Sequence, residues 1–261
     1  MVMKERHEQI LQLMYHQQTV TVAELSKRFS LSPVTIRSDL NQLAEQGKVV
    51  RTHGGARLGD ERTRQEYSVT IQKRLMAAEK RRIGKLAASL VQPGESIMLD
   101  ASTTALAVGQ ALKQRTELFN VTVITTGIWT ALEMLGSTHL EVVLTGGRVR
   151  SSTGSIAGLV ANDVLSRFHF HRAFLGGRGI SREAGLMDAP LIEVEIKQAV
   201  IPRCHEVIAV VDSSKFGRVS LATIASLTDI SRVVTDGGVP TQFMDIFREQ
   251  GVEILIANEG E

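Results

Sequence analysis

A carboxylate and three hydroxyls follow one short apolar run near the middle of the chain. Asp100 ends the run SIMLD, and Ser102, Thr103 and Thr104 come directly after it, where a helix is expected to start. A helix start presents unpaired backbone N–H groups that suit a phosphate, and a carboxylate can accept hydrogen bonds from sugar hydroxyls. The same Ser and Thr residues could instead serve only as helix caps. We expect a site for phosphate and hydroxyl groups.

A lysine at a second strand end could supply the matching positive charge. Lys215 lies three residues after Asp212 in VDSSK, and it could hold a phosphate, pair with Asp212 or face solvent. In EVEIKQAV, Glu193 and Lys197 have the spacing of a simple helix-stabilising pair, while Glu195 faces elsewhere. The predicted ligand site comprises Asp100, Ser102, Thr103, Thr104, Thr125, Thr126, Gly146, Gly147, Lys197, Asp212 and Lys215.

Other segments carry weaker chemical signals. TGGR at 145–148 and LGGRG at 175–179 lack the spacing of phosphate-binding loops, and we interpret them as tight turns. His169 and His171 would share one face of a strand, but no third ligand lies near them in the sequence. Two solvated histidines are therefore expected rather than a metal site, and we predict neither a metal nor a cofactor.

The elements that must position these groups follow from the pattern after Lys80. Short β-branched runs alternate with helical stretches, which is typical of a mostly parallel sheet covered by helices on both faces. The predicted strands are SIMLD, VTVITT, EVVLTGG, RAFLGG, VIAVVD, RVVTD and VEILIA, and the predicted helices span 103–114, 129–135, 162–167, 192–202 and 241–250. Ligands bind beyond the carboxyl ends of the strands in such α/β sheets, so the residues named above should gather at one edge.

A helix of a different kind is predicted over 31–47, LSPVTIRSDLNQLAEQG. Ser32 suits its N-cap, Pro33 its first turn and Gly47 a left-handed C-cap. From Ile36, apolar residues recur at i, i+4 and i+7 and form one stripe. The opposite face carries short hydrogen-bonding side chains, and such a helix fits the major groove of B-DNA.

Neighbouring segments complete a helix-turn-helix with a wing. Residues 23–29 predict a short helix, and three residues separate its end from Pro33, which is the usual turn length. VVRTHGGARL predicts two strands around a Gly-Gly turn. The predicted DNA contacts are Ser32, Val34, Thr35, Arg37, Ser38 and Asn41 on the helix, with Arg51, His53 and Arg57 on the wing, placed for phosphates or the minor groove.

Charge and composition limit the functional classes. The net charge is +2, and residues 1–58 hold eight Lys or Arg and five Asp or Glu, which leaves −1 for the rest. The single cysteine, Cys204, excludes an intrachain disulfide and fits a reducing cytoplasm. No run resembles a signal core or a membrane span, and 4% aromatic residues argue against single-stranded nucleic acid as the ligand. We predict a DNA-binding domain at 1–58, a linker at 59–79 that runs into a helix near Ser68, and an α/β domain at 80–261.

The motifs of both parts resemble the DeoR-type bacterial regulators over nearly the whole chain. The N-terminal match comprises Arg6, Ile10, Met14, Ser32, Thr35, Ile36, Arg37, Asp39 and Leu40, and LDASTT, ITTG, LTGG, AFLGGRG, EVEIKQAV and VDSSKFGR follow in the family's order. Ser38 departs from the usual Lys, Arg, Asn or Ala, which affects the identity of the base contacts. His171 stands where the family often has Asp, a change that would alter either effector shape or surface charge.

The resemblance implies a winged helix-turn-helix followed by an α/β domain similar to the ribose-5-phosphate isomerase and glucosamine-6-phosphate deaminase folds. It implies a cytoplasmic repressor of a carbohydrate or polyol catabolic operon, bound to double-stranded operator DNA as a homodimer or homotetramer and relieved by a phosphorylated sugar or polyol. Two alternatives stay open. A sugar-phosphate isomerase or deaminase with a DNA-binding extension would need a carboxylate base, for which Asp100, Glu193, Glu195 and Asp212 are candidates. A nucleoid-type DNA binder would lack an effector.

Overall fold

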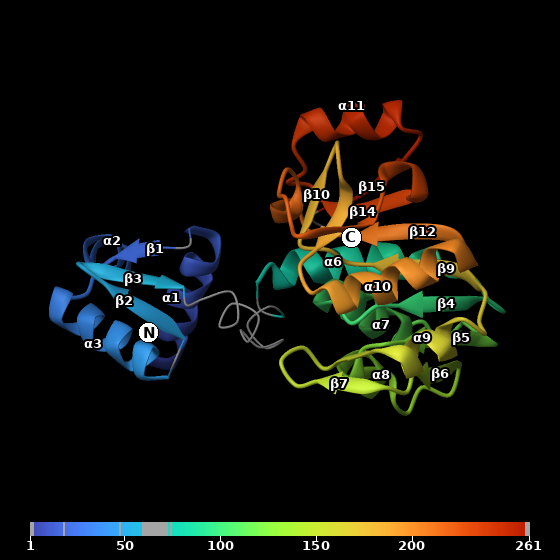
Figure 1. Cartoon of the computed structure of the whole chain (residues 1–261), viewed down its shortest axis with the longest axis horizontal. Coiled ribbons are helices and arrows are strands. Elements are labelled where there is room, and N and C mark those ends of the chain that lie inside the picture. Colours follow the sequence, from blue (N-terminus) through green and yellow to red (C-terminus); the bar gives the residue numbers. More distant parts are fainter. Residues whose placement is uncertain (1–2, 18, 47, 59–72, 74, 259–261) are drawn as a thin grey trace. The chain divides into compact units, whose positions relative to one another are not determined.

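The computed structural model describes residues 3–17, 19–46, 48–58, 73 and 75–258. The chain divides into two compact units, Met1–Leu75 and Met76–Glu261, which are shown in Figure 1. Gly47, the predicted helix near Ser68 and most of the predicted linker lie outside the described residues. None of the described helices has the length and apolar character needed to cross a membrane.

In the first unit, helices surround a small antiparallel sheet whose strands lie in the order β1-β3-β2. Its elements are α1 (Met3–Gln17), β1 (Thr19–Thr21), α2 (Val22–Phe29), α3 (Pro33–Glu45), β2 (Val49–Thr52) and β3 (Gly55–Leu58). The stripe predicted on the third helix is confirmed, because Ile36, Leu40 and Leu43 are fully buried in the core of this unit. The predicted wing is the hairpin β2–β3, in which Val49 pairs with Leu58.

The second unit is built on a seven-stranded sheet in which all neighbouring strands are parallel. The strand order is β15-β14-β12-β9-β4-β5-β6. The strands are β4 (Ser96–Leu99), β5 (Val121–Thr125), β6 (Leu140–Leu144), β9 (Phe170–Leu175), β12 (Cys204–Val210), β14 (Arg232–Asp236) and β15 (Glu253–Ala257). All seven runs predicted as strands are therefore strands, and the predicted fold class is confirmed.

Helices cover both faces of this sheet, as Figure 1 shows. They are α6 (Ala77–Ser89), α7 (Thr103–Lys113), α8 (Ile128–Met134), α9 (Leu159–Leu165), α10 (Leu191–Val200) and α11 (Thr241–Glu249). Successive strand residues point to opposite faces, so Ile97 and Leu99 pack with α6 and α7, whereas Met98 packs in the core that contains α9, α10 and α11. Burial on both faces explains why each strand is a continuous apolar run.

The order of the strands reverses between β4 and β9. From β4 the chain continues to β5 and β6 on one side, and it then returns to place β9 on the other side of β4. Such a reversal leaves a crevice at the carboxyl ends of the two strands, where ligands bind in open α/β sheets. Asp100 follows β4 and Gly176 follows β9, so both residues lie at this point.

Several elements differ from the prediction. Helix α9 begins at Leu159 rather than 162, and α10 ends at Val200 because Pro202 lies in a tighter 3₁₀ turn, Ile201–Arg203. Helix α6 begins at Ala77, inside the predicted linker. The sequence pattern also missed the hairpin of β7 (Arg148–Arg150) with β8 (Ser155–Ala157), and a small sheet of β10 (Gly179–Ser181), β11 (Gly185–Asp188) and β13 (Ala222–Ala225). These strands have three or four residues, too few for a clear alternation.

Candidate functional site

The outward face of α3 is organised as the sequence predicted. Ser32 caps the helix by accepting a hydrogen bond from the Thr35 backbone N–H at 3.2 Å, and Pro33 occupies the first turn. Val34 is 72% exposed, although an apolar side chain normally avoids solvent. Arg37, Ser38 and Asn41 are also exposed and line a surface hollow with Val34. A valine among hydrogen-bonding groups matches a helix that meets base edges and thymine methyl groups.

A buried ion pair anchors α3 to α1. Both carboxylate oxygens of Asp39 accept from Arg6, at 2.6 and 2.9 Å, and the His7 ring lies 3.0 Å from Asp39 Oδ1. Burial raises the pKa of Asp39, but the hydrogen bonds and charges of Arg6 and His7 outweigh it and hold the pKa below its usual value. The family motif residues Arg6 and Asp39 therefore orient the recognition helix from behind.

The predicted DNA-contacting residues of the wing differ in the hydrogen bonds that they make within the domain. Arg51 donates to Asn41 Oδ1 at 2.9 Å and to the Gly55 carbonyl, so the wing is tied to the face of α3. Arg57 donates to the Leu58 carbonyl at 3.3 Å, and His53 is exposed at the turn between the two strands. A DNA contact of Arg51 would thus also fix the position of Asn41. The DNA contacts of all nine residues named in the sequence analysis stay predictions.

In the second unit, Asp100 lies buried at the point where the strand order reverses. Its Oδ1 accepts from the Ser102 N–H at 2.9 Å, its Oδ2 accepts from the Gly176 N–H at 2.8 Å, and Lys197 Nζ lies 3.0 Å from Oδ2. Ser102 caps α7 by accepting from the Ala105 N–H at 3.1 Å. Ser102 therefore acts as a helix cap, while Asp100 holds the ends of two adjacent strands together.

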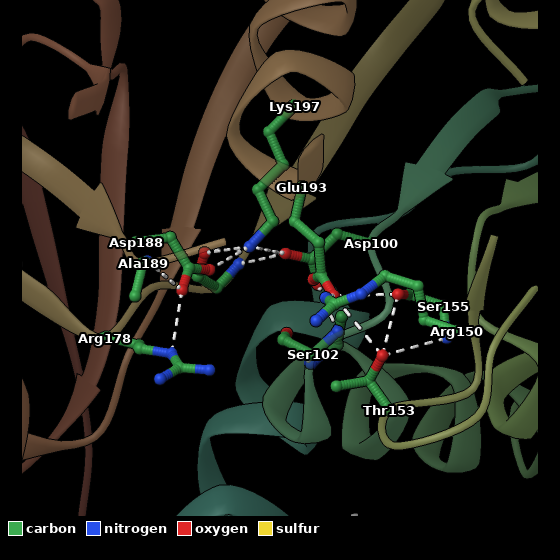
Figure 2. A network of polar contacts seen from close by, with 12 residues as sticks. Asp100, Ser102, Arg150, Thr153, Ser155, Arg178, Asp188, Ala189, Glu193 and Lys197 are labelled. Carbon is green, nitrogen blue, oxygen red and sulfur yellow. Dashed lines mark hydrogen bonds and ion pairs between the residues drawn. The ribbon is translucent and has the colours of Figure 1, made fainter. Parts of the chain in front are cut away.

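Lys197 is the centre of this network, drawn in Figure 2. Its Nζ donates to Asp188 Oδ2 at 2.8 Å and to the Gly176 carbonyl at 2.9 Å, in addition to the contact with Asp100. Burial lowers the pKa of Lys197, but the charges of Asp100 and Asp188 outweigh it and raise the pKa above its ordinary value. Arg178 Nε lies 3.0 Å from the second oxygen of Asp188. The lysine is thus a fixed cation between two carboxylates.

Glu193 has different partners from those the helix spacing suggested. Its carboxylate pairs with Arg150 and accepts from Ser155 Oγ at 2.8 Å and from Thr153 Oγ1 at 3.4 Å. These three residues belong to the β7–β8 hairpin, which Figure 2 shows beside Glu193. The interpretation of Glu193 and Lys197 as a helix-stabilising pair is therefore wrong, because each residue forms its ion pairs with residues outside α10. Glu195 is exposed on the other side of the helix, as predicted.

The hairpin closes the space in front of Lys197. A cavity of about 10 Å³ remains between Ser155, Glu193, Lys197, Thr126 and their neighbours. That volume holds about one water molecule. A sugar-sized ligand therefore requires the hairpin and Glu193 to move away from Lys197.

The predicted residues at β5 and β6 occupy the same edge of the sheet. Thr125 is buried and accepts from the Gly127 N–H at 3.0 Å, which stabilises the turn into α8. Thr126 lines the small cavity. Gly146 and Gly147 lie in the turn between β6 and β7, where the φ of Gly147 is +137° and favours glycine. The expectation of a tight turn at TGGR is therefore confirmed.

A second polar cluster lies beyond β9, at the end of β12. Asp212 is fully buried, and its Oδ1 accepts from the N–H and the hydroxyl of Ser214. Its Oδ2 lies 3.8 Å from Lys215 Nζ and accepts no hydrogen bond from the residues that the structure describes. Strands are about 4.8 Å apart, so this cluster lies roughly 10 Å from Asp100, two strands away.

The sequence analysis missed Lys80, which contributes to this second cluster from α6. Burial lowers the pKa of Lys80 to about 8, although the charge of Asp212 opposes the shift, and Lys215 lowers it further. Helices α6 and α7 both run antiparallel to β4. The two helices touch at Gly84 and Ala107, where a Cβ atom added to Gly84 would lie only 2.5 Å from the Ala107 carbonyl oxygen. One turn before that contact, α6 carries Lys80 and α7 begins at Thr103.

Thr103 and Thr104 follow the cap residue Ser102 in the first turn of α7. Thr104 is buried and Thr103 is partly exposed at the start of α7. The sequence also missed Arg150, Ser155, Arg178 and Asp188, because they lie on short elements that only tertiary packing brings to Lys197. Lys197, their common neighbour, was among the predicted ligand-site residues.

The two histidines lie at the opposite edge of the sheet. His171 Nδ1 is 3.0 Å from the backbone nitrogen of Ser96, at the amino end of β4, and His169 contributes a carbonyl that accepts from the Ser96 hydroxyl. His171 is therefore remote from the carboxyl ends of the strands, and of the two effects considered for it, only surface charge fits this position. Among the described residues, no cluster of three metal-ligating side chains occurs.

Comparisons with known proteins agree with both halves of this architecture. A model described as the DeoR-like helix-turn-helix domain matches residues 6–62, and one described as the DeoR C terminal sensor domain matches residues 75–237. The HTH-type transcriptional regulator GolR of Listeria innocua is 33% identical over 254 residues, covering 97% of this chain and 98% of that protein.

One further sequence relative and one solved structure were also compared with this chain. The glycerol-3-phosphate regulon repressor of Escherichia coli K12 is 32% identical over 250 residues, covering 96% of this chain and 97% of that protein. Ribose 5-phosphate isomerase A of Methanocaldococcus jannaschii has a TM-score of 0.41 at 20% identity, over 54% of this chain and 55% of that chain. With a recognition helix, a wing and a matching sensor domain, this chain belongs to the DeoR family of DNA-binding transcriptional regulators.

Proposed function

We propose that the protein is a cytoplasmic repressor of a carbohydrate or polyol catabolic operon that leaves its operator when a phosphorylated sugar or polyol binds. The observation that carries the proposal is the fully buried Lys197 between Asp100 and Asp188, at the point of the sheet where ligands bind. The names of the relatives, which include a glycerol-3-phosphate regulon repressor, support an effector of this class.

The two polar clusters suit the two ends of such a ligand. Around Lys197 the three cations Lys197, Arg178 and Arg150 are balanced by three carboxylates, so a neutral polyol chain can exchange hydrogen bonds there without adding charge. Lys80 and Lys215 place two positive charges near the buried carboxylate of Asp212, at the end of β12. That cluster is the better place for a phosphate.

The positions of three of the four candidate carboxylates support a sensor over an isomerase or a deaminase. The fourth, Asp212, keeps one oxygen that accepts no hydrogen bond from the described residues, so the assay below also tests this residue. A general base must be free to take a proton from the substrate. Asp100 accepts two backbone N–H groups and contacts Lys197, and Glu193 pairs with Arg150. Glu195 faces away from the site. A turnover assay with aldose and ketose phosphates and hexosamine phosphates is expected to show no product; conversion by the purified protein would favour the enzyme.

The effector is expected to act by binding one of two conformations more tightly. In a gel-shift titration with the operator found upstream of the regulated genes, a phosphorylated sugar or polyol should release the protein, whereas the unphosphorylated compound should not. Release by both compounds at similar concentrations would contradict the phosphate cluster. Operator binding that no compound of this class changes would favour the nucleoid-type DNA binder.

Replacing Arg37 tests the recognition helix. Arg37→Ala should weaken operator binding by about 1–3 kcal/mol in a base-selective way if the guanidinium contacts a guanine edge. If it contacts a phosphate, the loss should be the same for all sequences and the salt slope should fall by about one. Arg248→Ala, at an exposed arginine of α11, is the control. Equal affinities of the wild type and Arg37→Ala would exclude this face of α3.

A further inference from the structure

We propose that a second copy of this chain docks on an apolar surface formed by α8, the end of β6, the β7–β8 hairpin and α9. The surface, called here the apolar face, consists of Trp129, Leu132, Leu135, Leu144, Val149, Leu159 and Val160. These side chains are between 41% and 90% exposed. An exposed apolar surface of this extent usually marks a contact site.

The apolar face is continuous across its elements. The turn of the hairpin rests on α8, because any side chain at Gly154 would collide with the Trp129 ring, and the Ile128 N–H donates to the Gly154 carbonyl at 2.9 Å. At the other end, a side chain at Gly146 would meet Val160 at 3.5 Å. The end of β6, the hairpin and the start of α9 are therefore adjacent, and Figure 1 shows them with α8 on one side of the domain.

The hairpin separates this face from the ligand site. Adjacent residues of a strand point to opposite sides, and on β7 the side chain of Arg150 reaches Glu193 while Val149 is 52% exposed. The inner side of the hairpin thus belongs to the polar network of Lys197. Its outer side has no role in that network, so the exposed valine needs another explanation.

The edge strand of the sheet lies at the same surface. β6 is the last strand on its side of the seven-stranded sheet and consists of LEVVL, with Leu144 exposed at its end. Edge strands that stay single are usually protected by lysine, proline or a covering element, because their free backbone groups attract other strands. This strand has only Glu141 as a charged residue. An apolar strand at the end of the sheet, beside the exposed leucines of α8, favours a permanent partner.

The size of the apolar face fits one side of a stable dimer. Full burial of a Leu or Val side chain corresponds to roughly 60–120 Å² of apolar area, so the seven partly exposed side chains offer about 400 Å². A standard interface buries about 800 Å² on each partner, of which about 56–65% is non-polar. The apolar face supplies most of that non-polar share.

A second copy is the partner that this chemistry favours. An apolar surface is complementary to itself, as the two-fold symmetric interface of a homodimer requires. The choice of this occupant rests on the proposed function, because one recognition helix reads only half of a two-fold symmetric operator. The location of the surface rests on exposure and packing alone.

Light scattering of the full-length chain after gel filtration tests the proposal without DNA or effector. The wild type should have at least twice the mass of one chain at micromolar concentration. Leu132→Glu on α8 and Leu159→Glu on α9 should each weaken self-association by about tenfold or more, because a carboxylate is buried against apolar groups. Leu221→Glu, at a leucine that is 67% exposed outside the apolar face, should keep the wild-type mass.

Circular dichroism and thermal unfolding decide whether a smaller mass reflects lost association or lost folding. Both variant positions are at least half exposed, so the spectra of the three variants should match the wild type. A monomeric wild type would overturn the proposal, as would wild-type mass in both Leu132→Glu and Leu159→Glu or equal dissociation of Leu221→Glu. Effector binding is not measured in this experiment, so failure of the sugar-phosphate assignment leaves its outcome unchanged.

Discussion

Replacing Lys197 by methionine is expected to destabilise the sensor domain by about 3–5 kcal/mol, because removal of one partner leaves buried charges uncompensated. Asp100 and Asp188 are 1% and 6% exposed and share this lysine at 3.0 and 2.8 Å. Urea unfolding at pH 8 measures the loss. Arg167→Met is the control, since Arg167 forms a solvent-exposed pair with Asp163, and exposed pairs contribute at most about 1 kcal/mol.

The pH dependence of the same variant gives a second, independent measurement. In the wild type the pKa of Asp188 is lowered and that of Lys197 is raised. The Asp188 contribution is present above its ordinary pKa of 3.8 and is lost as the pH falls through its lower folded value. The Lys197 contribution is present below 10.5 and is lost as the pH rises through its higher folded value.

The network therefore contributes fully to stability at neutral pH. Without Lys197, the pKa of Asp188 should rise, so acid should neutralise this carboxylate and reduce the penalty. The loss in free energy of unfolding caused by Lys197→Met should be smaller at pH 5 than at pH 8. Adding Asp188→Asn to this variant should recover part of the lost free energy. A deficit of the size seen for Arg167→Met, or one that does not change with pH, would show that Lys197 is not a paired buried cation.

Lys215→Ala should shift the response to much higher concentrations of the phosphorylated effector while leaving operator affinity unchanged. The ammonium lies 3.8 Å from Asp212 Oδ2, and in the proposed site it would supply a charge-assisted contact to the phosphate. Such contacts contribute about 1.5–3 kcal/mol, which corresponds to roughly 10- to 100-fold in effector concentration. Lys113→Ala is the matched control, because Lys113 is exposed in the same domain and donates to the carbonyls of Glu133 and Leu135.

Calorimetry with the DNA-free protein separates this effect from operator binding. A normal response of Lys215→Ala, or an equal loss in Lys113→Ala, would reject the phosphate position. Asp100→Asn is a better probe of the sugar end than Asp100→Ala, because the amide keeps the side chain's volume beside Lys197. Asp100→Asn should weaken the binding of the phosphorylated effector while leaving some affinity for phosphate alone.

The lowered pKa of Lys80 predicts how effector binding changes with pH. This lysine is buried near Asp212, Lys215 and Glu79, and its pKa is about 8. Its positive charge is present below that value and is lost as the pH rises through it. The affinity of the sugar phosphate measured by the same calorimetry should therefore fall between pH 7 and pH 9.

Local patterns in the sequence determined the recognition helix and the sheet. The Ser32 cap, Pro33 in the first turn and the buried stripe of α3 involve residues within about three turns of one another. The seven parallel strands were predictable because burial on both faces requires continuous apolar runs. The carboxyl ends of such strands always meet at one edge, so the position of Asp100 was predictable without a structure.

Only the tertiary structure decided which groups pair at that edge. Helix periodicity favoured a bond between Glu193 and Lys197, but Lys197 instead joins Asp100 and Asp188, and Glu193 joins Arg150. A pair at i, i+4 on a helix contributes only about 0.5 kcal/mol. Two buried carboxylates that lie close together require a cation much more strongly. Their proximity arises because β11, which ends at Asp188, packs near the end of β4, and no local pattern encodes that packing.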